Sequence, residues 1–192
     1  MKNLITIPNI ISFFRILLIP IFAVAYFRDE LTMTWSLIIL IVSGISDVID
    51  GFIARKFNMI SDLGKVLDPI ADKLTQAVVL LCLTIKHMII LPTFIVLFVK
   101  ELLTLFAAIQ ILSNGTKPIS SRWFGKLSTV VIFITMAYAI IVDIYSLPQI
   151  PLHILNVVSI VCMSISVCGY FKMFKSQVKG DLNNDETLSK MQ

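Results

Sequence analysis

The sequence predicts an all-α integral membrane protein built as one bundle of six transmembrane helices. Hydrophobic residues make up 57% of the 192 residues, charged residues only 15%, and the mean hydropathy is +0.92. This composition is too apolar for an ordinary soluble domain. Several apolar segments approach the roughly 20 residues that a helix needs to cross a hydrocarbon core. We therefore expect the hydrophobic surface of the chain to face lipid.

The six predicted spans follow one another along the chain, separated by polar breaks. Their ranges are 8–27, 32–54, 62–86, 89–113, 127–146 and 150–174. The first span contains Arg15, and no small-residue cleavage pattern precedes Arg28 and Asp29. We therefore expect this segment to be a retained helix and not a removed signal peptide.

Lysine and arginine residues gather at alternate connections between these spans. The connections after the second and fourth spans are long and basic, whereas Arg28 and Lys86 mark the opposite side. The positive-inside rule therefore predicts that both termini are cytoplasmic, and we expect a bacterial cell membrane. Residues 1–175 form the predicted membrane domain, and residues 176–192, which lack an apolar face, are expected to be a mobile tail. The net charge of +4 suits anionic lipid headgroups, and no motif predicts nucleic-acid binding.

Four aspartates lie inside the second and third spans, where an ionisable residue is costly and indicates a functional site. Asp47 and Asp50 are three residues apart, and Asp68 and Asp72 are four apart, so each pair shares a helix face. Two adjacent antiparallel helices bring the pairs together at the cytoplasmic side. Carboxylates so close require a cation, and hard oxygen ligands select Mg²⁺ or Mn²⁺. Two such ions can clamp a diphosphate, so the acids predict phosphoryl chemistry.

Small and basic residues flank these aspartates. Gly51, Ala54 and Gly64 remove side-chain bulk from the neighbouring helix faces, so a nucleotide can approach the backbone there. Arg55 and Lys73 supply cations at a similar depth, where they can meet phosphate oxygens. The region is therefore predicted to bind a nucleotide phosphate.

The aspartates and their neighbours follow one fixed pattern. It reads Asp47-x-x-Asp50-Gly51-x-x-Ala54-Arg55, then eight residues, then Gly64-x-x-x-Asp68-x-x-x-Asp72. This pattern resembles the signature of the CDP-alcohol phosphatidyltransferase family, with every fixed position filled. The six-span layout and the opening at residues 7–15 are also similar to that family. The resemblance therefore extends over nearly the whole chain apart from the tail.

The resemblance implies a homodimeric six-helix enzyme of phospholipid biosynthesis. By residue-to-residue matching, the resemblance implies that Asp47, Asp50 and Asp68 bind two divalent cations. Asp72 matches the catalytic base of the family, which can also contact a metal. The residues matched to the CDP pocket are Gly51, Ala54, Arg55 and Gly64. The hydroxyl of the acceptor attacks the phosphorus next to diacylglycerol in CDP-diacylglycerol and expels CMP.

The expected acceptor is glycerol 3-phosphate, which gives phosphatidylglycerophosphate. The chain length, the opening segment and Gly125-Lys126 resemble the branch of the family with that product. Lys126 and Arg122, at the entrance to the fifth span, are expected to hold the acceptor phosphate, with anchoring to anionic lipid as the alternative. The branch pattern Gly-Lys-x-Lys-Thr is replaced by Gly-Lys-Leu-Ser-Thr at residues 125–129. Cardiolipin synthesis, with phosphatidylglycerol as the acceptor, therefore stays open.

Two further interpretations of the aspartates are considered. A cation carrier or proton-coupled transporter also places acids in membrane helices, but it predicts a path through the membrane and not a cluster near one face. Structural pairing of the aspartates with Arg55, Lys65 and Lys73 is the other alternative, which the cost of buried charge disfavours. Metal-dependent phosphatidyl transfer remains the leading prediction.

Four other polar residues are expected to play no part in the chemistry. Lys100 and Glu101 lie within the fourth span outside the fixed signature, and we expect a structural polar contact there. His87 and His153 lie near the predicted outer boundary, and we expect both on the surface.

Overall fold

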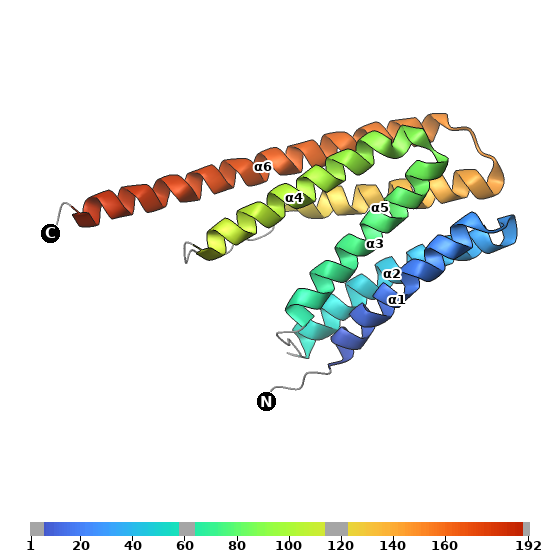
Figure 1. The fold of residues 1–192 in the computed structure, drawn as a ribbon, viewed down its shortest axis with the longest axis horizontal. Coiled ribbons are helices and arrows are strands. Elements are labelled where there is room, and N and C mark those ends of the chain that lie inside the picture. Colours follow the sequence, from blue (N-terminus) through green and yellow to red (C-terminus); the bar gives the residue numbers. More distant parts are fainter. Residues whose placement is uncertain (1–5, 58–63, 114–122, 190–192) are drawn as a thin grey trace.

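The computed structural model describes residues 6–57, 64–113 and 123–189, and these residues form helices without a β-strand. Figure 1 shows their arrangement. The elements are α1 (Ile7–Phe27), α2 (Glu30–Lys56), α3 (Gly64–Lys86), the 3₁₀ turn η1 (Met88–Ile90), α4 (Leu91–Ser113), α5 (Trp123–Tyr145) and α6 (Ile150–Ser189). All six predicted helices are therefore confirmed, with ends shifted by only a few residues except for α6.

The last helix, α6, continues without a break from the predicted sixth span into the predicted tail. Its helical backbone reaches Ser189, and the final residues 190–192 lie outside the described part of the chain. The boundary between a membrane domain at 1–175 and a mobile tail at 176–192 stays a prediction.

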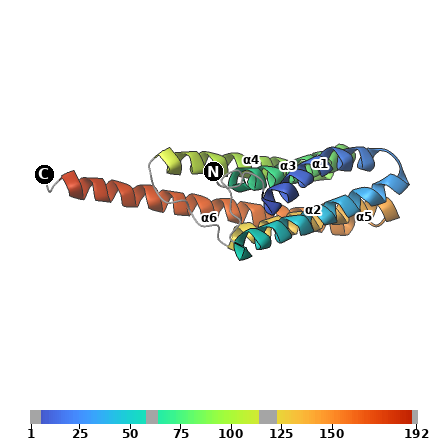
Figure 2. The ribbon, with the colours of Figure 1, turned by 90° about the horizontal axis from the view of Figure 1, so that it is seen from below.

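The helices lie in two layers. Figure 2 shows α1, α3 and α4 in one layer and α2, α5 and α6 in the other. Within and between the layers, α1 packs against α2 and α3, α5 packs against α6 and α2, and α4 packs against α6. The short link at Arg28 and Asp29 makes α1 and α2 antiparallel neighbours, and the backbone N–H of Asp29 donates to Thr32 Oγ1 at 2.8 Å where α2 begins.

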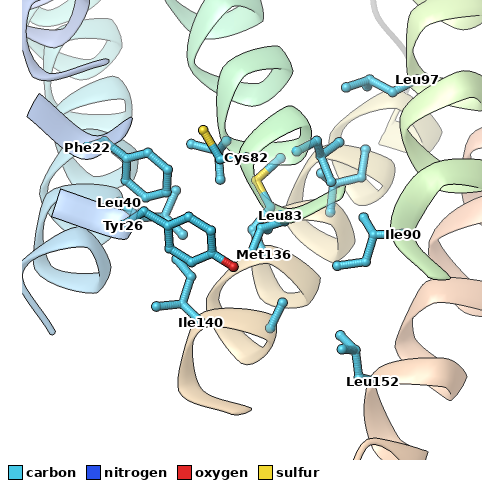
Figure 3. Packing of buried hydrophobic residues seen from close by; sticks show 14 of the residues in the cluster. Phe22, Tyr26, Leu40, Cys82, Leu83, Ile90, Leu97, Met136, Ile140 and Leu152 are labelled. Carbon is cyan, nitrogen blue, oxygen red and sulfur yellow. The ribbon is translucent and has the colours of Figure 1, made fainter. Parts of the chain in front are cut away.

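A hydrophobic core fills the space between the layers. Every long helix contributes to it, and Figure 3 shows its side chains between the helices, from Phe22 and Leu40 at one edge through Leu83 and Met136 to Leu152 at the other. The outward faces keep many large apolar side chains exposed, as expected for helices that contact lipid. The same hydrophobicity thus serves both an internal core and an external lipid surface.

Five of the described helices are long and apolar enough to cross a membrane, and α3 is the exception. The first half of α3 carries Asp68, Asp72 and Lys73, which lower its hydropathy. Its second half is apolar and supplies Val79, Leu80 and Leu83 to the core, where α1, α4 and α5 pack against it. The packing of α1, α4 and α5 therefore buries one side of α3, while Asp68 and Lys73 in its first half stay partly open to the surroundings.

Buried hydrogen bonds tie α6 to its neighbours. Asn156 on α6 pairs with the Thr93 hydroxyl and donates to the Ile89 carbonyl at 2.5 Å. The hydroxyls of Thr135 on α5 and Ser159 on α6 lie 2.8 Å apart. Polar bonds of this kind favour association of helices in lipid, where the hydrophobic effect between helices is weak.

A polar cluster fixes the end of the bundle opposite the aspartates. Asp143 on α5 accepts a hydrogen bond from the Tyr26 hydroxyl at 2.6 Å, and its other oxygen lies 2.7 Å from His87 Nε2. Lys86 Nζ lies 3.6 Å from the same carboxylate and 5.0 Å from the Tyr26 ring centroid. The expectation of a surface position is therefore wrong for His87, because the pairing with Asp143 draws its ring inward. His153 is exposed, as expected.

Candidate active site

Three of the four predicted aspartates converge where α2 ends and α3 begins. Asp47, Asp50 and Asp68 each offer one carboxylate oxygen, and these oxygens lie within 4.8 Å of one another. Asp50 is only 2% exposed, whereas Asp47 and Asp68 are partly open to the surroundings. The helical spacing of Asp47 and Asp50 places both on the side of α2 that faces α1, whose Arg15 contacts both carboxylates. The arrangement is an acidic cluster with one deeply buried member.

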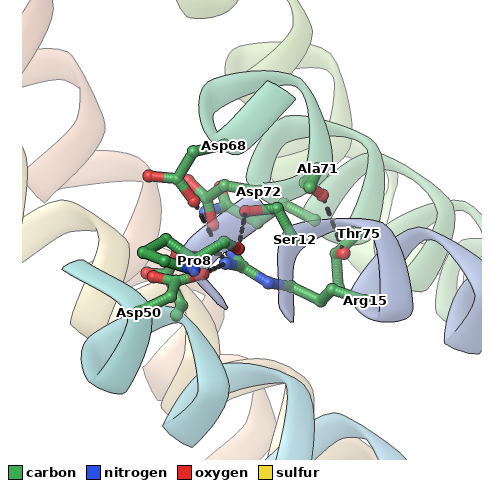
Figure 4. A network of polar contacts seen from close by, with 10 residues as sticks. Pro8, Ser12, Arg15, Asp50, Asp68, Ala71, Asp72 and Thr75 are labelled. Atoms are coloured by element: carbon green, nitrogen blue, oxygen red, sulfur yellow. Dashed lines mark hydrogen bonds and ion pairs between the residues drawn. The ribbon is translucent and has the colours of Figure 1, made fainter. Parts of the chain in front are cut away.

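Arg15 on α1 is the cation that faces these three carboxylates. Its side chain is 1% exposed. Nη1 donates to Asp47 Oδ1, and Nη2 donates to Asp50 Oδ2 at 2.5 Å and to Asp68 Oδ1 at 3.1 Å. Figure 4 shows the guanidinium reaching from α1 toward Asp50 and Asp68. One residue of the first helix therefore joins the two helices that carry the signature.

The sequence-based interpretation did not include Arg15 in the site. The sequence does contain a signal for Arg15, because a lone arginine inside an apolar span is costly and requires an acidic partner. The cations that the sequence offers as structural partners of the aspartates are Arg55, Lys65 and Lys73. Lys73 pairs with Glu101 at 2.9 Å, and the side chains of Arg55 and Lys65 lie outside the described part.

Asp72 lies one helical turn beyond Asp68 on α3, and Figure 4 shows the two side chains next to each other. It is not one of the three aspartates in the tight cluster. The buried Gln76 donates from Nε2 to Asp72 Oδ1 at 3.0 Å. Gln76 therefore holds one carboxylate oxygen of Asp72, and spacing of four residues on a helix is the sequence signal that points to this pair.

The residues matched to the CDP pocket lie beside the acidic cluster along α2 and α3. Gly51 and Ala54 follow Asp50 on α2 and are partly buried, and Gly64 is the first residue of α3. Arg55 belongs to α2, but its side chain lies outside the description. The backbone therefore places these residues near the aspartates.

Of the two residues expected to bind the acceptor, the structure describes Lys126 but not Arg122. Lys126 is exposed in the first turns of α5. Arg122 lies outside the described residues, between α4 and α5. Lys126 is therefore available at the surface, on the half of α5 away from Asp143.

A second ion-pair group lies beside this site, between α3 and α4. Glu101 accepts from Lys73 Nζ at 2.9 Å and from Lys100 Nζ at 3.1 Å. Lys100 is 7% exposed, so its ammonium depends on this carboxylate for charge compensation. Lys100 and Glu101 thus take part in structural polar contacts, and the expectation that they have no catalytic role stays a prediction.

The donor set of the aspartate cluster fits a divalent cation. Three carboxylates and one guanidinium leave a formal charge of −3 + 1 = −2. Asp50 Oδ1 is buried and has no hydrogen-bond partner among the residues that the structure describes. Hard oxygen ligands with uncompensated negative charge are those that Mg²⁺ and Mn²⁺ prefer.

Comparison with known proteins finds relatives whose names describe phospholipid-forming enzymes. A cardiolipin synthase (CMP-forming) from Streptomyces coelicolor is 35% identical over 131 residues, which cover 66% of this chain and 61% of that protein. A CDP-diacylglycerol–glycerol-3-phosphate 3-phosphatidyltransferase from Aquifex aeolicus is 29% identical over 174 residues, covering 88% of this chain and 96% of that protein. The Escherichia coli K12 protein of the same name is 27% identical over 139 residues, covering 69% and 75%.

The strongest comparison is with a whole family. The sequence profile described as CDP-alcohol phosphatidyltransferase matches residues 5–168, which include α1 to α5 and most of the apolar part of α6. The match therefore contains the aspartate cluster, Arg15, Asp72 and Lys126. This chain belongs to the CDP-alcohol phosphatidyltransferase family.

Proposed function

We propose that the chain transfers the phosphatidyl group of CDP-diacylglycerol to the hydroxyl of an alcohol, with release of CMP, in phospholipid biosynthesis. The observation that carries this proposal is the convergence of Asp47, Asp50 and Asp68 within 4.8 Å in a membrane protein of this family. Such a site suits a diphosphate, whose charge must be neutralised before it can be attacked.

Asp47, Asp50 and Asp68 would hold two divalent cations, Mg²⁺ or Mn²⁺, and Asp72 can contact them. When bound, the cations offset the negative charge of the diphosphate and of the leaving phosphate. The residues of the chain orient this assembly, because α2 and α3 fix the three carboxylates in one place. Gly51, Ala54, Arg55 and Gly64 would line the space for the CDP group.

Asp72 is proposed as the general base. It takes the proton of the acceptor hydroxyl while the hydroxyl oxygen forms a bond to the phosphorus that carries diacylglycerol. The bond between that phosphorus and the oxygen of CMP breaks, and CMP leaves with the electron pair. Gln76 holds Asp72 Oδ1 at 3.0 Å, so the base keeps a fixed orientation toward the acceptor.

Glycerol 3-phosphate is the proposed acceptor. The relatives from Aquifex aeolicus and Escherichia coli carry that acceptor in their names, and the first of them aligns over 88% of this chain. Lys126 is exposed at the start of α5, where it can offset the charge of a phosphate monoester. Arg122 is proposed to assist Lys126.

Phosphatidylglycerol is the second candidate acceptor, which would make the product cardiolipin. It is supported by the Streptomyces coelicolor relative, a CMP-forming cardiolipin synthase that is 35% identical over 131 residues. The transporter interpretation has no comparable support, because the family contains transferases. The proposed partners are therefore lipids and a small alcohol, with no nucleic acid.

The protein is an integral membrane enzyme, and its proposed location is the bacterial cell membrane with both termini and the aspartates facing the cytoplasm. The distribution of lysine and arginine in the sequence supports this orientation. A homodimer is proposed on the basis of family resemblance. Large exposed apolar side chains, such as Phe13, Leu17 and Val24 on α1, offer surfaces for lipid or for a second copy.

One experiment tests the proposed reaction and its acceptor together. The purified protein in detergent receives CDP-diacylglycerol and Mg²⁺ or Mn²⁺, and then glycerol 3-phosphate, phosphatidylglycerol, serine or an inositol phosphate separately. CMP release and a lipid of the mass of phosphatidylglycerophosphate are expected with glycerol 3-phosphate alone. Product only with phosphatidylglycerol would select cardiolipin synthesis, and no CMP release with any acceptor would overturn the proposed reaction.

A further inference from the structure

Arg15 has no part in the proposed reaction, yet it lies at the centre of the aspartate cluster. Its side chain is 1% exposed, and its two terminal nitrogens donate to one oxygen each of Asp47, Asp50 and Asp68. An unpaired guanidinium inside a membrane bundle is strongly unfavourable. The carboxylates therefore fix Arg15, and Arg15 reduces the repulsion among the carboxylates.

The carboxylates that bind Arg15 are the same ones that the proposed metal ions require. The guanidinium and a divalent cation are both attracted to these carboxylates, and they repel each other. The cluster keeps a formal charge of −2 with Arg15 in place, and within the described part of the chain Asp50 Oδ1 has no hydrogen-bond partner. A first cation can therefore be attracted while Arg15 is bound, but full metal loading must weaken the contacts of Arg15.

We propose that Arg15 is a positioning residue that acts as the resident counter-cation of the metal site. In the metal-free protein it holds Asp47, Asp50 and Asp68 together across three helices. On metal binding it competes with the incoming cations for these carboxylates, and it thereby lowers metal affinity while preserving the geometry of the site. This inference rests on the proposed metal-dependent function.

The competition can be measured without any lipid substrate. The full chain in detergent is titrated with Mn²⁺, and the concentration of free Mn²⁺ is measured by electron paramagnetic resonance. Thermal unfolding of the same protein is recorded with and without Mn²⁺. Arg15→Gln is expected to bind Mn²⁺ about tenfold more tightly, equivalent to about 1.4 kcal/mol, near the lower end for one charge-assisted hydrogen bond. Its metal-free unfolding temperature should fall, and Mn²⁺ should raise that temperature more than in the wild type.

Two further variants keep the test specific. Arg15→Lys retains the charge but loses the planar fork that reaches several carboxylates, so its Mn²⁺ affinity should lie between those of the wild type and Arg15→Gln. Arg28→Gln removes the arginine just beyond the other end of α1 and should leave Mn²⁺ affinity unchanged. If Arg15→Gln does not fold without metal, purification in Mn²⁺ followed by titration of a chelator gives the same comparison.

The outcomes separate this inference from the proposed function. If the wild type binds Mn²⁺ but Arg15→Gln and Arg15→Lys bind it equally well or more weakly, Arg15 is a structural support only and the inference is wrong. If the wild type binds no Mn²⁺ at all, the metal site itself is wrong, and the inference is overturned with it. Tighter binding by Arg15→Gln, intermediate binding by Arg15→Lys and no change in Arg28→Gln is the result that supports competition.

Discussion

The guanidinium of Arg15 on α1 lies 2.5 Å from the carboxylate of Asp50 on α2, and both side chains are almost fully buried. The contact joins residues 35 positions apart in the sequence. It brings the first helix of the bundle into a site whose signature lies entirely on the second and third helices. The aspartate cluster is therefore held by contacts among three helices, α1, α2 and α3.

Replacing any one of Asp47, Asp50 or Asp68 by asparagine should abolish most turnover through weaker metal binding. Each change removes an anionic oxygen ligand, and we expect CMP release to fall by about a hundredfold or more, since even partners of metal ligands contribute up to this much. Higher Mg²⁺ or Mn²⁺ should restore part of the activity. The matched control is Asp29→Asn, which changes an exposed aspartate before α2 and should behave as the wild type. Full activity in any one cluster variant would contradict its assignment as an essential ligand.

Asp72→Asn should lose catalysis while it keeps CDP-diacylglycerol binding. A general base acts mainly in the transition state, so kcat should fall by about two to four powers of ten. Gln76→Met removes the hydrogen bond to Asp72 and should lower kcat by about tenfold, near the contribution of one hydrogen bond. Equal losses of binding and turnover in Asp72→Asn would indicate a ligand and not a base.

Lys126→Ala should raise the KM for glycerol 3-phosphate by about tenfold, as expected for one charge-assisted contact, and leave the KM for CDP-diacylglycerol nearly unchanged. Arg122→Ala should act in the same direction more weakly. Arg28→Ala, at the opposite end of the bundle, should alter neither constant. Equal effects on both substrates would favour a role for Lys126 in anchoring α5 to anionic lipid.

Asp143→Asn should lower stability without a specific loss of activity. The change weakens contacts with Tyr26, His87 and Lys86, and the free energy of unfolding should fall by about 1–3 kcal/mol, the usual cost of disrupting buried hydrogen bonds to a charged group. Tyr26→Phe removes one of these bonds and should have a smaller effect. Thermal unfolding in detergent measures the change, and CMP release per folded molecule serves as the check. A selective loss of turnover at full stability would show that this cluster acts on the distant site.

Gly44→Ala should be less stable than Gly169→Ala, although both remove a helix glycine. A Cβ at Gly44 would lie 2.8 Å from Cε1 of Phe133 on α5, whereas a Cβ at Gly169 meets nothing within 4 Å. Alanine favours a helix over glycine by about 1 kcal/mol, but overpacking costs about 1–3 kcal/mol. The unfolding temperatures of the two variants test this difference. The double variant Gly44→Ala with Phe133→Leu should recover stability, and no recovery would exclude the steric explanation.

The candidate site was partly predictable from local patterns. Asp47, Asp50 and Asp68 were expected to meet, because their spacing fixes a helix face and their spans are neighbours. The structure adds two residues to the site, Arg15 and Gln76. It also shows that Asp72 is not part of the tight carboxylate cluster. His87 shows the opposite case, in which a residue expected on the surface is drawn inward by a carboxylate 56 positions away.

By itself, the sequence determined the all-helical membrane class, the order of the six helices and the acidic signature. These properties depend on hydropathy and on helical periodicity, which are set by residues close together in the chain. Only the tertiary structure decided that Arg15 faces Asp47, Asp50 and Asp68, and that α1, α4 and α5 pack against α3. The physical reason is that such contacts depend on the rotation and layering of whole helices. Packing across the bundle fixes the rotation of each helix and the layer in which it lies, and no local sequence pattern specifies these two properties.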